Sequence, residues 1–181
     1  MRRVILLLAT MALAFPAAAQ ARPDTIEVRG SSSGFGRVLA IGDFKPQRDP
    51  TYGAAVAVFG EPASERSRFM GHGCTVNWPG SGVRIVFANF GTGSACDRDL
   101  GRSQNARAYG EQWRTKRGLK VGARLRRLRN LYPRARRHGR SWWLVTAVSL
   151  IGEERPYPVL AATVRGGRVR SFTLSIGAAG D

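Results

Sequence analysis

The sequence predicts an α+β protein with two tandem modules, each a short helix followed by about three antiparallel strands. Two stretches show the apolar spacing of a short helix, and each precedes runs of β-forming residues separated by Pro-Gly or Gly-Gly turns. Glycine supplies 22 of the 181 residues, which favours a turn-rich β protein over a helical bundle. The predicted divisions are a signal peptide at 1–21, an N-terminal segment at 22–48, a first module at 49–116 and a second module at 117–181.

The first 21 residues have the parts of a secretory signal peptide. Arg2 and Arg3 are positive, Val4–Phe15 is apolar, and 17–21 has small residues in an A-x-A arrangement, which places cleavage after Ala21. The apolar run is about half the roughly 20 residues that span a bilayer, so a retained anchor is the less favoured alternative. No cysteine for lipid attachment follows the apolar run, and no second long apolar segment exists. We expect a secreted or periplasmic protein without a transmembrane span.

The segment at 22–48 is predicted to hold two short strands, Thr25–Arg29 and Arg37–Ile41. Between them lies the glycine- and serine-rich stretch 30–36. This stretch lacks the G-x-G-x-x-G spacing and a following lysine, so it indicates a flexible loop in preference to a phosphate-binding loop.

The first module begins with a well-delimited helix. Asp49 is a suitable N-cap, and Pro50 suits the first helical position. Apolar residues at i, i+4 and i+7 run from Tyr52 to Phe59, and Gly60 is expected to end the helix.

Three strands are expected after this helix. Cys74–Trp78 and Val83–Phe90 are rich in β-forming residues, and the turn residues at 79–82 indicate a hairpin. Ala106–Thr115 is the third predicted strand.

The second module repeats this order. Val121, Leu125, Leu128 and Tyr132 have the spacing of a short helix, which Pro133 is expected to end.

The strands expected after the second helix include a tight hairpin. Trp142–Ile151 is apolar without clean alternation, so both of its faces are expected to be covered. Val159–Val164 and Arg168–Ile176 flank Gly-Gly at 166–167 and are predicted to pair.

This duplicated pattern resembles the β-lactamase-inhibitor-like fold, and it is similar to the single module of small outer-membrane assembly lipoproteins. The residues that carry the resemblance are Gly53-x-x-Val56-x-x-Phe59-Gly60-x-Pro62 and Gly122-x-x-Leu125-x-x-Leu128. It covers 43–176. The second helix lacks the Gly-x-Pro ending, and the lipid-attachment cysteine of the lipoproteins is missing. The resemblance implies a non-catalytic binding fold and carries over no partner or contact residue.

Cys74 and Cys96 are the only cysteines. In an exported protein an even pair indicates a disulfide, which would close a loop of about 23 residues and contribute roughly 3 kcal/mol. The alternative is a metal or redox pair, but the spacing is far from C-x-x-C and the two histidines are distant in sequence.

The strongest local anomaly is basic. The formal charge is +17, or +15 without the signal peptide, and no acid occurs between Gln112 and Gly152. Arginine forks suit phosphate and carboxylate groups, so this region is a candidate polyanion-binding surface, although an arginine-biased proteome would produce the same excess. The candidate residues are Lys120, Arg124, Arg126, Arg127, Arg129, Arg134, Arg136 and Arg137.

The sequence offers little to support catalysis. A Cys-His nucleophile needs a free thiol, and no G-x-S-x-G motif exists for a serine nucleophile. His72 and His138 are the only histidines, and the close acids, such as Asp97 and Asp99, lack a calcium-loop pattern. We expect a non-enzyme with no cofactor and no metal.

Three functions remain to be compared. The favoured one is an exported binding domain that contacts an anionic envelope polymer or lipid surface; export argues against intracellular nucleic acid as the partner. The second is a module that binds or inhibits another exported protein, and it requires that Trp142 and Trp143 are not both fully buried. The third and least favoured is a hydrolase.

Overall fold

The computed structural model describes residues 24–149 and 155–177. The protein is α+β, as the sequence predicts, with two short helices and two sheets. The predicted signal peptide lies outside the described residues. Among the described residues, no helix is long and apolar enough to cross a bilayer.

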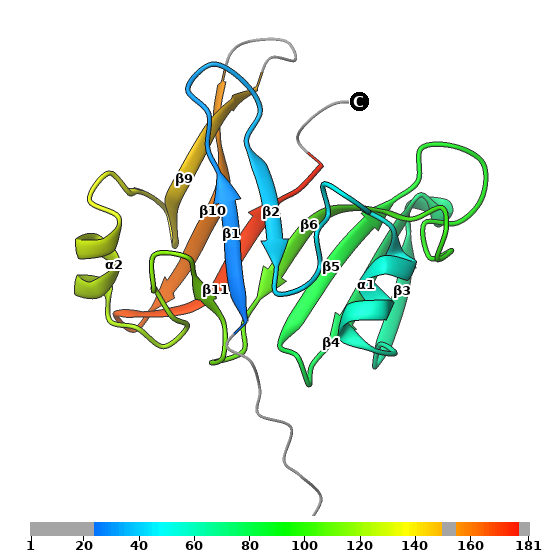
Figure 1. Cartoon of the computed structure of the whole chain (residues 1–181), viewed down its shortest axis with the longest axis horizontal. Helices are drawn as coiled ribbons and strands as arrows, with labels where there is room; N and C mark the ends of the chain where they lie inside the picture. Colours follow the sequence, from blue (N-terminus) through cyan, green and yellow to red (C-terminus); the bar gives the residue numbers. More distant parts are fainter. Residues whose placement is uncertain (1–23, 150–154, 178–181) are drawn as a thin grey trace, which may run out of the picture.

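The larger sheet has eight antiparallel strands in the order β3-β4-β5-β6-β11-β10-β9-β8. Figure 1 shows this sheet running across the whole molecule. Its strands are β3 (Ser64–Arg68), β4 (Gly73–Trp78), β5 (Val83–Ala88), β6 (Arg102–Ala108), β8 (Arg136–His138), β9 (Ser141–Ser149), β10 (Arg155–Arg165) and β11 (Arg168–Ser175).

Two four-stranded meanders make up this sheet. Helix α1 (Tyr52–Phe59) precedes β3 to β6, and helix α2 (Leu125–Leu131) precedes β8 to β11. The last strands of the two meanders, β6 and β11, pair with each other, with Phe172 opposite Ala108. A hydrogen-bonded seam therefore joins the two halves into one sheet.

The smaller sheet has the order β2-β1-β7, and it packs on the larger sheet. Strands β1 (Thr25–Arg29) and β2 (Arg37–Ile41) have the predicted bounds and pair antiparallel. Strand β7 (Arg114–Thr115) runs parallel to β1. The single strand predicted at Ala106–Thr115 is therefore wrong, because β6 ends at Ala108 and a turn carries the chain to the other sheet.

The hydrophobic core lies between the larger sheet and the elements that cover one of its faces. Directly opposed residues on neighbouring strands share a face, and one such row crosses six strands. It consists of Trp78, Val83, Ala108, Phe172, Ala162 and Trp142, all buried. Helix residues such as Tyr52 and Leu128, and small-sheet residues such as Ile26, belong to the same core. We call the opposite side of the larger sheet the open face.

The N-terminus of α1 differs from the prediction by two residues. Thr51 is the N-cap, and its hydroxyl accepts a hydrogen bond from the Ala54 amide at 3.1 Å. Asp49 instead accepts hydrogen bonds from the amide and hydroxyl of Thr51, which lower the pKa of its carboxyl group. Gly60 ends the helix with φ 80°, a positive value that glycine adopts readily.

Removal of this cap gives the first testable prediction. Thr51→Ala is expected to lower the free energy of unfolding by about 1 kcal/mol, because the Ala54 amide loses its acceptor. Urea denaturation followed by circular dichroism measures the change. Thr92→Ala, at an exposed loop position, is the control and should change stability by less than about 0.5 kcal/mol. Equal losses in the two variants would show that the cap contributes nothing specific.

Helix α2 is shorter than its apolar spacing suggests. It begins at Leu125, because Gly122 adopts φ 86° and Val121 lies in the preceding turn. Leu128 is fully buried, and the helix ends at Leu131 with Tyr132 as its C-cap, directly before Pro133 as predicted. The first and last turns of α2 contain no acid, and arginine supplies most of its exposed surface.

Candidate anion-binding surface

The eight predicted polyanion-binding residues are all exposed. Lys120 and Arg124 precede α2, Arg134 lies in the connection to β8, and the others lie on α2 or β8. The basic residues of this region therefore stand at the surface, where their charges are available to a partner.

Two aromatic rings hold arginine side chains beside α2. The Arg129 guanidinium carbon lies 5.2 Å from the centroid of the Trp142 ring, and that of Arg117 lies 5.2 Å from the Tyr132 ring. Such stacking restricts the side chain while leaving the outer edge of the guanidinium free for hydrogen bonds. Burial raises the pKa of the Tyr132 hydroxyl above its ordinary value, while the nearby Arg117 acts in the opposite direction.

Arg136 and Arg137 are adjacent in the sequence, but strand β8 places their side chains on opposite faces of the larger sheet. Arg136 lies opposite Trp143, and Arg137 lies opposite Trp142. Since successive side chains of a strand point to opposite faces, Arg136 lies on the open face and Arg137 on the helix-covered side. The predicted set is thus divided between two faces of the sheet.

The open face carries further arginines outside the predicted set. Arg84 lies opposite Arg107, and Arg107 lies opposite Thr173, in a row that reaches Trp143 and Arg136 at the β8 edge. Arg66 lies on the same face, one row away. The sequence signal for Arg84 is its place between Val83 and Ile85 in an otherwise apolar run, but the face it shares with Arg107 depends on strand register.

Neutral side chains orient two of these arginines. Arg84 donates a hydrogen bond from Nε to Asn77, and Arg107 donates from Nε to the Ser171 hydroxyl at 3.0 Å. Both hydrogen bonds use Nε, and among the described residues the terminal nitrogens of these two guanidinium groups form no further hydrogen bond. Both residues are exposed.

The described strands of the larger sheet contain one acid, Glu65. Glu65 lies opposite the buried Val76, on the side of the sheet that carries the core. Its carboxylate accepts a hydrogen bond from the Tyr52 hydroxyl. The pKa of that hydroxyl is raised, mainly by burial and secondly by this hydrogen bond. The open face therefore carries arginines with no strand carboxylate to neutralise them.

A groove lies at the β8–β9 end of the open face. It has a volume of about 590 Å³ and is lined by residues that include Arg134, Arg136, Trp143 and Pro156. The ring of His138 stacks on that of Trp143 at 3.7 Å, with 14° between the planes. The groove combines positive charge with an aromatic wall.

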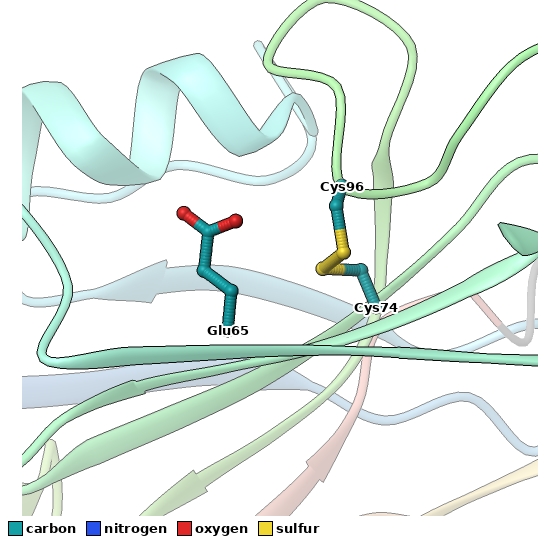
Figure 2. A group of neighbouring side chains, drawn as sticks. All are labelled: Glu65, Cys74 and Cys96. Carbon is teal, nitrogen blue, oxygen red and sulfur yellow. A yellow bond between two sulfur atoms is a disulfide. The ribbon is translucent and has the colours of Figure 1, made fainter.

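The cysteines form the predicted disulfide, with Cα atoms 5.1 Å apart. Figure 2 shows Glu65 beside this bond, on the same side of the sheet. The ligand atoms of Glu65, Cys74 and Cys96 lie within 4.8 Å of one another, but both sulfur atoms are bonded and offer no thiolate. The group does not fit a metal site.

The two histidines lie at opposite ends of the larger sheet. His72 lies between β3 and β4, where its Nδ1 is 2.9 Å from the Asn89 carbonyl oxygen, and His138 ends β8. They are not brought together.

The two tryptophans of β9 differ in exposure. Trp142 is buried, while Trp143 is partly exposed in the groove. An interface on the sheet face would be excluded if both rings were completely buried. Trp143 is partly exposed, so that interface is not excluded.

No protein-family profile, curated protein sequence or solved structure matches the chain.

Proposed function

We propose that this protein is an exported, non-enzymatic binding domain that contacts an anionic partner of the cell envelope or extracellular space. The observation that carries the proposal is the uncompensated basic surface. All eight predicted basic residues are exposed, and the strands of the open face add arginines without an acid.

Export is supported by two independent features. The first 21 residues have the composition of a signal peptide, and the Cys74–Cys96 disulfide suits an oxidising compartment. In that setting the abundant polyanions are acidic polymers and anionic lipids.

Arginine geometry favours binding of phosphate or carboxylate groups on such partners. The planar guanidinium group donates two parallel hydrogen bonds to a phosphate or carboxylate group. Because the charges are spread over several elements, they suit an extended partner better than one small ion. An interaction of this kind weakens as salt screens it.

The proposal is tested by removing charge from the predicted basic residues, which lie on both sides of the larger sheet, and separately from a control region. The first variant replaces Arg124, Arg127, Arg136 and Arg137 by Ser; the matched control replaces Arg29, Arg37, Lys45 and Arg48, which are also exposed, so that both lose four charges. Binding to phosphatidylglycerol vesicles and to heparin is measured from 50 to 500 mM salt. Each basic residue near an anionic surface contributes about 1 kcal/mol, so the first variant should bind at least about tenfold more weakly than the control.

Two results would contradict the proposal. One is wild-type binding that does not change with salt. The other is equal binding by the wild type and the first variant.

A second candidate is a module that binds another exported protein through the open face. It is favoured by the partly exposed Trp143, whose groove could receive a side chain of a partner. The two helix-plus-meander halves would then be the tandem modules expected from the sequence. Trp143→Ser should abolish such binding at high salt while leaving vesicle binding at low salt unchanged.

A further inference from the structure

The three most exposed large apolar side chains among the described residues lie at one end of the larger sheet. Phe69 is 78% exposed, Met70 is 100% exposed and Phe90 is 87% exposed. Val58 and Leu100, the other large apolar residues exposed in the described ranges, are 39% and 40% exposed. We call Phe69, Met70 and Phe90 the apolar tip.

Two neighbouring connections carry these residues. Phe69 and Met70 lie in η1 (Phe69–Gly71), between β3 and β4, while Phe90 follows β5. The connections are joined by hydrogen bonds from the Asn89 amide to the His72 carbonyl, at 3.0 Å, and from the Ala95 amide to the Gly71 carbonyl, at 2.7 Å.

The backbone of the tip is in an unfavourable conformation. Phe69 has φ 53° and Met70 has φ 55°, values that bulky L-residues rarely adopt. Strained backbone persists where surrounding contacts hold it, and such sites are concentrated at functional surfaces. Here the Cys74–Cys96 disulfide ties β4 to the loop that carries Phe90, so the apolar side chains are held outward on a braced support.

Arginines lie on the strands that lead to the tip. Arg68, Gly73, Ala88 and Arg102 lie opposite one another in a row at the same end of the sheet, and Arg66 is exposed one row away. In the adjoining loop, the Asp97 carboxylate accepts hydrogen bonds from the Asp99 and Leu100 amides. An apolar projection bordered by arginine matches a membrane interface, where anionic headgroups lie above apolar acyl chains.

We propose that the apolar tip inserts into the interface of an anionic membrane, with the bordering arginines at the headgroups. This inference rests on the proposed attraction to anionic partners, but it assigns one partner, a lipid surface, and uses different residues. Arginine attraction brings the protein to the membrane, and burial of the tip then gives a component of binding that salt does not screen.

The experiment compares the full mature chain with a Phe69→Ser/Met70→Ser/Phe90→Ser variant. Val58→Ser, an exposed apolar position on α1, is the control. Binding is measured to vesicles of phosphatidylglycerol and of phosphatidylcholine, at 50 and 500 mM salt. We expect the triple variant to bind phosphatidylglycerol at least about tenfold more weakly and to lose all binding at high salt, because it has lost the apolar component. The control should match the wild type.

A second variant keeps a large apolar side chain at position 69 and tests whether that side chain enters the membrane. Compared with the wild type, which has four tryptophans of its own, Phe69→Trp should show additional blue-shifted emission on phosphatidylglycerol vesicles, with additional quenching by brominated acyl chains and no change on phosphatidylcholine. Absence of this additional quenching in vesicle-bound protein would overturn the inference.

Two further outcomes also overturn it. One is a triple variant that binds phosphatidylglycerol with the affinity and salt dependence of the wild type. The other is a wild-type dimer that dissociates in the triple variant while vesicle binding stays unchanged, which would assign the tip to a second copy of the chain. Neither depends on the four-arginine variant, whose failure would instead contradict the proposed function.

Discussion

Phe172→Ala is expected to lower the free energy of unfolding by about 3–5 kcal/mol, the range for removing a fully buried aromatic ring. Phe172 is completely buried on β11, opposite Ala108 of β6 and Ala162 of β10. It therefore lies at the seam between the two meanders. Because its neighbours there are alanines, no large side chain directly opposite it can fill the cavity.

The position of the ring also predicts how the protein unfolds. Both meanders share the core row that passes through Phe172, so they should unfold in one transition. Urea denaturation followed by tryptophan fluorescence and by circular dichroism measures the loss and tests whether the two curves coincide. Thr173→Ala, at the next and exposed position, should cost less than about 1 kcal/mol. A loss for Phe172→Ala no larger than that of Thr173→Ala would refute the central role of the seam.

Removal of the disulfide is the second large effect expected. The bond joins residues 22 positions apart, and the chain-entropy relation for such a loop gives a loss of about 3 kcal/mol in a Cys74→Ala/Cys96→Ala variant. Reduction of the wild type should produce a similar loss.

The control for this experiment is the double variant treated with reductant, whose stability should not change further. Thiol labelling of the folded, oxidised wild type should find no reactive cysteine, since both sulfur atoms are bonded. Labelling of both cysteines, or a double variant as stable as the wild type, would contradict the prediction. The Ala95 amide, which donates to the Gly71 carbonyl beside the bond, should also exchange its hydrogen faster in the variant.

Local patterns in the sequence predict much of the fold. Turn residues and apolar runs locate β1, β2 and the β10–β11 hairpin, whose turn residues Gly166 and Gly167 both have positive φ. The unpredicted strands, β3 and β8, read SERSR and RRH and contain no apolar residue. Their strand conformation comes from pairing with one neighbour, which no local pattern in their own residues records.

The surface is predictable in composition but not in arrangement. The charge of 114–140 is evident from the sequence, and its exposure follows from the burial of Leu128. Whether Arg136 and Arg137 share a face depends on pairing with β9, and the alignment of Arg84 with Arg107 depends on the register of β5 and β6. Long-range pairing therefore decides which arginines act together.

The composition of the two outermost strands has a consequence for self-association. An unpaired sheet edge offers free backbone groups to another molecule, and edge-to-edge joining of sheets leads to aggregates. Here β3 and β8 end the larger sheet on either side, and every residue in both is exposed and polar or charged. Arginines on both edges oppose pairing with the like-charged edge of a second copy, so the strands that are hardest to recognise from sequence are also the ones that disfavour growth of the sheet.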